Sequence, residues 1–533
     1  MLKLTPYRTC LFVICIGLFL HTPSIGEAAP AAEQLFTQAQ FEPARRAYAA
    51  QVLAAPGDAA GWVGLVRTLL RLDRWDEARA EAQAFTAKFP NNADAHGLLS
   101  LSLIRAGWQE PYVDEAGKSL TLDPQNYWGL MASGHIADWN GKIEDARASF
   151  HKASEVHPEL PDAWGEIFLL DDDRGHIQEQ LTAAQTYVNL NPQGHPHDEL
   201  SEDARDVLAH SQAYRDAFEA DPPYQHSEGA DDAKSSGSVS SGSLTMEFTG
   251  DFALFPVSIN GSPFRLLFDT GGGDDILLNW KAAQRLSLPV IAHSFVRGVS
   301  GKEKSDTLKA QTMTVAGRTY KSIKIDTADA LDGIGDGILG GDILQDSVMT
   351  LDFEQRTASL SQGSSAQPPA TLAGDCSVAF PFHFYHGDLY VKLALNGTPV
   401  WALIDTGAFT STLSLRLARQ ELKAVPKEDA FSGSDNGRHG VGKTNRKMDY
   451  IASRDQSQIT LSLVPPASMP MDTVGTSDLD RIISPSPTCD FEVSLWVGMS
   501  SLTYARRLTF DYPRQQLIFE YQVPDAPPVT KKK

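Results

Sequence analysis

Two aspartates in identical tripeptides are the residues of this chain best suited to chemistry. Asp-Thr-Gly occurs at 269–271 in FRLLFDTGGGD and again at 405–407 in VWALIDTGAFT, each time behind an apolar run. A water molecule held between two carboxylates can hydrolyse a peptide bond, if one ionised carboxylate accepts its proton and a protonated one polarises the carbonyl. Two carboxylates within about 3 Å cannot both ionise, so they share a proton. This chemistry requires Asp269 and Asp405 to meet.

The residues before each triplet align as well. LFPVSINGSPFRLLFDTG (254–271) and YVKLALNGTPVWALIDTG (390–407) are identical at seven of eighteen positions. The Asn-Gly pairs at Asn260 and Asn396 favour two-residue hairpins. Each copy is therefore predicted to open with a hairpin whose second strand runs into Asp-Thr-Gly.

The two copies also close alike. Two apolar residues precede Gly340 in the first copy and Gly498 in the second, and a short amphipathic segment and a strand with Asp-Phe or Asp-Tyr follow. Short apolar runs between turn residues predict a mainly-β texture throughout. We therefore expect two tandem β-rich halves, 244–362 and 376–524.

The halves resemble lobes of retropepsin-like aspartic proteases, in which a strand leads to Asp-Thr-Gly, a flap hairpin, an apolar-apolar-Gly strand and a short helix. The resemblance implies that Asp269 and Asp405 are catalytic and that the lobes pair within one chain as a pseudo-dimer, with a polypeptide as substrate. Thr270, Gly271, Thr406, Gly407, Gly340 and Gly498 would support the catalytic loops. The flap candidates are Gly298 and Gly301 in VRGVSGKEK, and Gly440 and Gly442 in SGSDNGRHGVGK.

Some residues depart from the protease pattern. The first triplet continues as Gly272-Gly273-Asp274-Asp275, Trp496 is bulky for the second closing motif, and Ser500 stands where the first copy has Asp342. Two further hypotheses follow: a non-catalytic scaffold that binds peptides with degenerate lobes, and a homodimer in which each lobe pairs with another chain.

Residues 31–220 carry a helical repeat. Prolines recur every 34 residues, and small residues five positions after the first four of them are predicted to lie where helices meet: Pro56, Pro90, Pro124, Pro158 and Pro192; Gly61, Ala95, Gly129 and Ala163. One fixed period over four intervals predicts a solenoid. The segment resembles tetratricopeptide (TPR) repeats, whose concave face would bind a peptide or protein partner.

The remaining segments predict the cellular location of the protein and the boundaries between its domains. Lys3 and Arg8 precede the apolar run CLFVICIGLFL, which predicts a signal peptide over 1–28 and a periplasmic or secreted protein with no membrane contact after cleavage; an uncleaved anchor is the alternative. Polar stretches at 221–243 and 363–375 are predicted linkers, and 525–533 a tail. Cys376 and Cys489 could form one disulfide in an oxidising compartment, or remain buried thiols.

Composition argues against other classes of function. A formal net charge of −21 repels phosphate backbones, so nucleic acid is not an expected partner. His383 and His386 lie three apart on a predicted strand and would face opposite sides, so no shared metal is expected. The His-Pro-His at 195–197 is predicted to be a surface loop, and the glycines at 271–273 precede acids rather than a lysine. No cofactor is expected.

Overall fold

The computed structural model describes residues 31–522 with gaps. Residues outside this description are 1–30, 171–175, 192–198, 219–224, 227–239, 251, 273–275, 299–300, 329–334, 345–346, 363–365, 373–374, 386, 396–397, 410, 415–431, 435–446, 452–459, 465–466, 471–473, 478–494 and 523–533. The predicted signal peptide and tail lie among them. No helix of the described part is long and apolar enough to cross a membrane.

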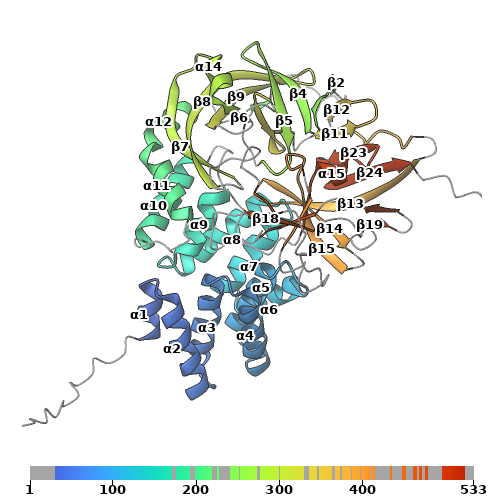
Figure 1. Cartoon of the computed structure of the whole chain (residues 1–533). Helices are drawn as coiled ribbons and strands as arrows, with labels where there is room; N and C mark the ends of the chain where they lie inside the picture. The colour runs from blue at the N-terminus through green and yellow to red at the C-terminus, as the bar shows by residue number, and fades with distance from the viewer. Residues whose placement is uncertain are drawn as a thin grey trace, which may run out of the picture.

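The first part of the chain consists of α-helices (Figure 1). Their bounds are α1 Ala32–Thr37, α2 Phe41–Ala54, α3 Ala59–Arg71, α4 Trp75–Lys88, α5 Ala93–Arg105, α6 Tyr112–Leu122, α7 Tyr127–Trp139, α8 Ile143–Val156, α9 Pro161–Leu170, α10 Ile177–Leu190, α11 Glu199–Ala209 and α12 Ser211–Phe218. From α1 to α11 each helix packs against the next, and α12 packs against α10. We call α1–α12 the helical domain. The helices α2, α4, α6 and α8 each end two residues before a repeat proline.

The 34-residue period also places the helix caps. Asp58, Asn92 and Asn126, each two residues after a repeat proline, accept a backbone N–H of the following helix. A side-chain oxygen at this position satisfies one of the helix's unpaired N–H groups. The Pro-x-Asp/Asn unit therefore ends one helix and starts the next.

Large residues one position after the small ones close the turns between helices. The Trp62 indole N–H donates to the carbonyl of Pro56 at 3.2 Å, and Trp164 donates to Pro158 at 3.4 Å. The small residues just before them, Gly61 and Ala163, are buried. The TPR-like repeat predicted from the sequence is confirmed.

The first lobe is a sheet that closes on itself. Strand order is β9-β6-β10-β5-β4-β8, and β8 also pairs with β9, while the hairpin strand β7 lies at the edge. The elements are β1 Gln225–His226, β3 Glu247–Thr249, β4 Phe252–Ile259, β5 Ser262–Asp269, β6 Ile276–Asn279, α14 Trp280–Gln284, β7 Val290–Gly298, β8 Gly301–Val315, β9 Arg318–Ala328, β10 Gly337–Gly340 and the 3-10 helix η1 Asp342–Leu344. The predicted turn at Asn260 and Gly261 has positive φ at both residues, as a type I′ hairpin turn requires.

The second lobe repeats this order of elements. It comprises β13 Asp375–Tyr385, β14 Asp388–Leu395, β15 Thr398–Ile404, β16 Ser411–Ser414, β17 Ser432–Ser434, β18 Lys447–Ile451, β19 Thr460–Val464, β20 Ala467–Pro470, β21 Val474–Ser477, β22 Leu495–Val497, α15 Met499–Leu502, β23 Arg507–Asp511, the 3-10 helix η5 Tyr512–Arg514 and β24 Gln516–Gln522. Strands β14, β15, β16 and β22 correspond to β4, β5, β6 and β10. The predicted Asn396 turn lies outside the described residues.

One sheet joins the lobes. Its strand order is β13-β24-β23-β11-β12-β2, with β2 Ser240–Thr245, β11 Ser347–Asp352 and β12 Thr357–Gln362 contributed by the first lobe. The central strands β11 and β23 are the closing strands of the two copies, and Thr350 pairs with its counterpart Thr509. A residue can pair with its own counterpart only where the two copies are related by a two-fold axis. The predicted mainly-β pseudo-dimer is confirmed.

The helical domain packs directly on the second lobe. The Trp139 ring, at the end of α7, stacks on His383 with centroids 4.6 Å apart and meets Trp401 edge-on at 5.0 Å. The His383 Nδ1–H donates to the Trp139 carbonyl at 3.0 Å. Trp139, Tyr385 and Tyr390 belong to one buried cluster with core residues of the helices.

The same helices reach the first lobe at its edge hairpin. Ile291 on β7 packs against a small cluster that includes Phe218 of α12. Lys309 Nζ donates to the Ala217 carbonyl at 2.6 Å. The helical domain therefore contacts both lobes (Figure 1).

Both predicted linkers contain ordered contacts. β1 and the first part of β2 lie within 221–243, and β2 pairs along β12 over six residues, from Thr245 to Ser240. A polar strand is compatible with a sheet edge, where one side faces solvent. In 363–375, Arg514 and Arg507 donate to the carbonyls of Ala366 and Ala370, each at 2.7 Å.

Candidate active site

Each Asp-Thr-Gly loop begins where a strand ends beside an apolar-apolar-Gly strand. In the first lobe β5 pairs in parallel with β10, and Asp269 lies opposite Gly340. In the second, β15 pairs in parallel with β22, and the Asp405 N–H donates to the Val497 carbonyl at 3.0 Å. Both aspartates thus stand at the carboxyl end of a strand buried in its lobe.

The threonines of the two loops hold each other. The Thr270 hydroxyl donates to the Ile404 carbonyl at 2.5 Å and accepts the Thr406 N–H at 3.1 Å. The Thr406 hydroxyl donates to the Phe268 carbonyl at 2.8 Å and accepts the Thr270 N–H at 3.0 Å. Both side chains are buried. Four reciprocal hydrogen bonds fix the loops to one another across the axis.

The glycines make room for the carboxyl of the opposite lobe. A Cβ at Gly271 would lie 2.8 Å from Cγ of Asp405, and a Cβ at Gly407 would overlap the carboxyl of Asp269. Neither glycine has a positive φ. The requirement is therefore space rather than backbone conformation, and it shows that each carboxyl rests on the backbone of the other loop.

Backbone N–H groups orient the carboxyls. Gly271 N–H donates to Asp269 Oδ1 at 3.0 Å, while Gly407 and Ala408 N–H donate to Asp405 Oδ1 at 2.8 Å each. Ala408 was not a predicted site residue, since a main-chain donor leaves no side-chain signal in a sequence. Asp405 is 6% exposed and Asp269 is half-buried.

The two carboxyls differ electrostatically. Burial raises the pKa of Asp269 above its ordinary value, against hydrogen bonds from Gly271 N–H and from the Asp405 carboxyl. Burial raises the pKa of Asp405 further, reinforced by the negative charge of Asp269 and the hydrogen bond that Asp405 donates to it. The two carboxyls therefore share a proton and titrate as a pair.

The closing segment of the second lobe supports its loop. Met499 N–H donates to the Ala408 carbonyl at 2.8 Å, and Ser500 N–H donates to that of Phe409 at 2.9 Å. Gly498 N–H donates to the hydroxyl of Ser411 at 3.1 Å. Ser500 thus serves the loop through its backbone, which does not require an aspartate there.

In the first lobe, the flap candidates Gly298 and Gly301 lie at the ends of two paired strands. β7 and β8 form a hairpin in which Gly298 pairs with Gly301. The second-lobe candidates Gly440 and Gly442 lie outside the described residues, as do Gly273, Asp274 and Asp275. Cys376 is an exposed free cysteine, and its predicted partner Cys489 also lies outside the description, so the disulfide stays a prediction.

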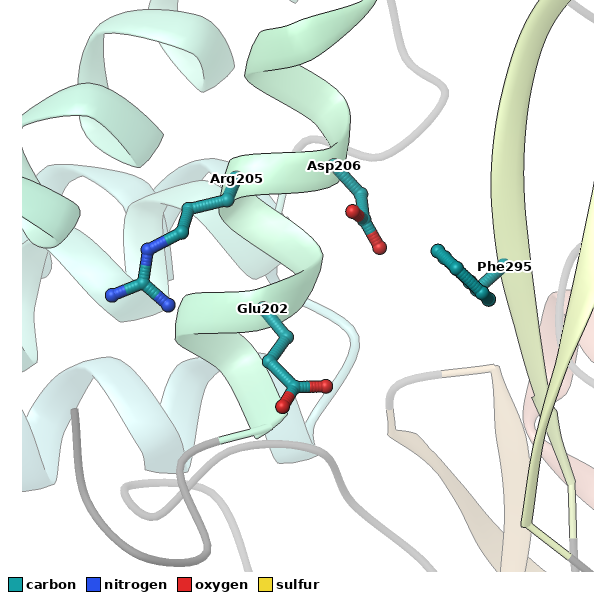
Figure 2. Close-up of a pocket in the computed structure, with 4 residues that line it drawn as sticks. All are labelled: Glu202, Arg205, Asp206 and Phe295. Carbon is teal, nitrogen blue, oxygen red and sulfur yellow. The ribbon is translucent and has the colours of Figure 1, made fainter.

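Two aromatic features lie near these elements. Phe409, four residues after Asp405, is 50% exposed, and its ring centroid is 6.1 Å from that of Phe252. On the outer side of the hairpin, Phe295 of β7 faces α11 across a cavity of about 340 Å³ (Figure 2). This cavity is lined by Glu202, Arg205, Asp206 and Phe295, none of which belongs to the carboxyl pair.

The described part of the chain contains no set of side chains arranged to bind a metal ion. No cluster of three or more histidine, cysteine or acidic side chains could hold an ion there. His383 stacks on Trp139, and His386 lies outside the description.

Comparison with known proteins agrees with this geometry. Residues 255–343 match the family model described as aspartyl protease. No curated protein matches the chain. The match and the helical repeats show that a TPR-like region precedes an aspartyl protease-type segment.

Several solved structures are similar to parts of the chain. An aspartic proteinase from Irpex lacteus has 12% identity and a TM-score of 0.32, covering 53% of this chain and 98% of its own. A retropepsin-like aspartic protease from Rickettsia conorii has 20% identity and a TM-score of 0.19, covering 24% and 94%. A TPR protein from Thermus thermophilus has 18% identity and a TM-score of 0.28, covering 34% and 95%.

Proposed function

We propose that this protein is an aspartic endopeptidase whose site is built from Asp269 and Asp405 of one chain. The observation that carries the proposal is the mutual packing of the loops, in which each glycine of one triplet abuts the aspartate of the other. Buried carboxyls that share a proton at neutral or mildly acidic pH are what hydrolysis without a metal or a nucleophilic side chain requires.

In this mechanism the ionised Asp269 is the general base. It accepts a proton from a water held between the carboxyls, while Asp405 donates its proton to the oxygen of the scissile carbonyl. The resulting tetrahedral intermediate collapses when the leaving nitrogen takes the proton from Asp269 and Asp405 recovers its own from the hydroxyl. No covalent enzyme intermediate forms, and the fixed N–H donors keep both carboxyls in place throughout.

The substrate is an extended polypeptide. The hairpin of β7 and β8 offers backbone groups to pair with such a chain, while neighbouring pockets select its side chains. The helical domain assists in this scheme by engaging substrate or a protein partner, and the predicted signal peptide directs the protein to the periplasm or outside the cell. Binding to the helical repeats and this location are parts of the proposal.

The test is cleavage of an unstructured protein substrate between pH 3 and 7. Asp269→Asn and Asp405→Asn should each abolish cleavage while the fold is retained, whereas the surface variant Asp76→Asn on α4 should cut like wild type. If folded wild type cuts nothing, or both site variants cut like wild type, the enzyme proposal fails. Peptide binding without cleavage would then favour a non-catalytic scaffold.

A further inference from the structure

The two copies differ at one position on the strand that neighbours each catalytic aspartate. Along β4 and β5, the pairing ends with Leu254 opposite Leu267, and Phe252 and Asp269 each lie two residues beyond this last pair. Along β14 and β15, the pairing ends with Tyr390 opposite Leu403, and Asp388 and Asp405 each lie two residues beyond this last pair. At this position of the neighbouring strand, one catalytic aspartate therefore has a phenylalanine and the other a third acidic residue.

Opposite residues of an antiparallel pair point to the same face of the sheet. Acidic side chains that share a face on neighbouring strands can lie close enough for like charges to repel. Asp388 is half-buried, which limits screening by solvent. In accord with this placement, the negative charge of Asp388 adds to the causes that raise the pKa of Asp405. Asp269 has no such neighbour across its own pair of strands, because Phe252 is uncharged.

We infer that Asp388 is a positioning residue that keeps the shared proton on Asp405 and so makes Asp269 the base. The inference rests on the proposed function for its consequence in catalysis, but the location of the proton can be measured without catalysis. If the two lobes were fully symmetric, the two catalytic carboxyls would have the same pKa and the same role. A charge on one side only gives them different roles.

Asp388 is held by residues that connect it to the helical domain. The Tyr390 hydroxyl donates to Asp388 Oδ2 at 3.2 Å. The Tyr390 ring is buried, with its centroid 5.4 Å from that of Trp139 on α7. The packing of α7 on the second lobe thus supports the strand that carries Asp388.

Other titratable groups near Asp388 come from two strands and one helix. Tyr385 of β13 lies opposite Asp388, and its hydroxyl is 3.3 Å from His135 Nδ1 of α7. Lys392, further along β14, extends over the Trp401 ring at 5.3 Å.

The test compares the pH profile of kcat/KM for wild type and Asp388→Asn. Activity on the basic side requires a protonated Asp405, so loss of the Asp388 charge should move the basic limb toward acid and leave the acid limb nearly unchanged. On the basic limb we expect roughly three- to tenfold lower activity at a fixed pH. Phe252→Leu, at the matching position of the first lobe, should leave both limbs in place.

A second measurement does not depend on turnover. Titration of the aspartate carboxyls by carbon NMR on the full-length protein should show Asp405 losing its proton at lower pH in Asp388→Asn than in wild type. An unchanged titration overturns the inference, even if the protein is an active protease. If the titration shifts but wild type cuts no substrate, the proposed function fails and the inference stands. Should Asp388→Asn not fold, Tyr390→Phe should give a smaller shift in the same direction.

Discussion

The hydroxyls of Thr350 and Thr509 are 2.8 Å apart at the centre of the sheet that joins the lobes. These threonines occupy the same position in the two copies, 159 residues apart in sequence. The same axis relates Thr270 to Thr406 and Asp269 to Asp405. Hydrogen bonds between symmetric residues thus hold the lobes together both at the interlobe sheet and at the carboxyl pair.

Removal of a loop threonine should destabilise the whole pair of lobes. Thr270→Ala deletes a buried hydroxyl and leaves the Ile404 carbonyl and the Thr406 N–H without their partner. We expect a loss of roughly 2–4 kcal/mol in the free energy of unfolding, measured by denaturant titration. Thr270→Ser keeps the hydroxyl and should cost about 1 kcal/mol or less. Equal stability of the alanine variant and wild type would contradict the role given to these hydrogen bonds.

Truncation of Trp139 should loosen the helical domain from the second lobe. Trp139→Ala removes the stacked ring from His383 and the edge-on contact with Trp401. A loss of about 3–5 kcal/mol is expected, and thermal unfolding should separate into a helical and a β transition. Trp164→Ala, which removes an indole that bonds within its own repeat, should weaken the helices without separating the transitions. A single transition for Trp139→Ala would show that the contact does not couple the domains.

The carboxyl pair should make the protein less stable as pH rises. Burial raises the folded-state pKa of Asp405 and Asp269, so the folded protein holds protons that the unfolded chain releases. Their stabilising contribution is complete below the ordinary aspartate pKa of about 4 and is lost as pH rises through the folded values. The free energy of unfolding of wild type should fall with a slope of up to about 1.4 kcal/mol per pH unit and bound proton. Asp405→Asn should flatten this slope, and identical slopes would contradict a shared buried proton.

The contact between the helical domain and the second lobe should weaken as pH falls, whereas the carboxyl pair loses its stabilising effect as pH rises. Burial lowers the pKa of His383 below its ordinary value of 6.5, despite the bond to the Trp139 carbonyl and with help from the positive charge of Lys392. The neutral ring is favoured in the folded protein, so its contribution is complete above that ordinary value and is lost as pH falls below it.

His383→Asn retains an N–H donor for the Trp139 carbonyl but cannot titrate near neutrality. If wild type loses stability of the docked helices between pH 7 and 5, as followed by tryptophan fluorescence, this variant should not. A variant with the same pH response as wild type would locate the titrating group elsewhere.

Features with local periodicity or internal symmetry could be predicted from the sequence. The 34-residue period predicted the helical repeat, because proline terminates a helix at one fixed place in each unit. The Asp and Asn caps two residues after the prolines were not predicted. The two Asp-Thr-Gly triplets predicted the carboxyl pair, because similar flanking sequences indicate that both triplets follow equivalent strands. The glycines at 271 and 407 were expected to support the loops, but the sequence did not indicate that a Cβ at either would crowd the carboxyl of the opposite lobe.

Contacts between distant parts of the chain could not be predicted in this way. Trp139 and His383 are 244 residues apart, and nothing in either repeat indicates that α7 meets β13. Asp388 aligned with Phe252 in the sequence, but its effect on Asp405 depends on strand register, which the alignment does not specify. Such residues act through tertiary placement, for which a single sequence gives no periodic signal.

Mixing the two inactive variants tests most directly whether one chain builds the whole site. Asp269→Asn and Asp405→Asn should each be inactive on an unstructured protein substrate, and an equimolar mixture, unfolded and refolded together, should remain inactive because both aspartates must come from the same chain. Restored cleavage in the mixture would show that the lobes of different chains pair, and it would contradict a site formed within one chain.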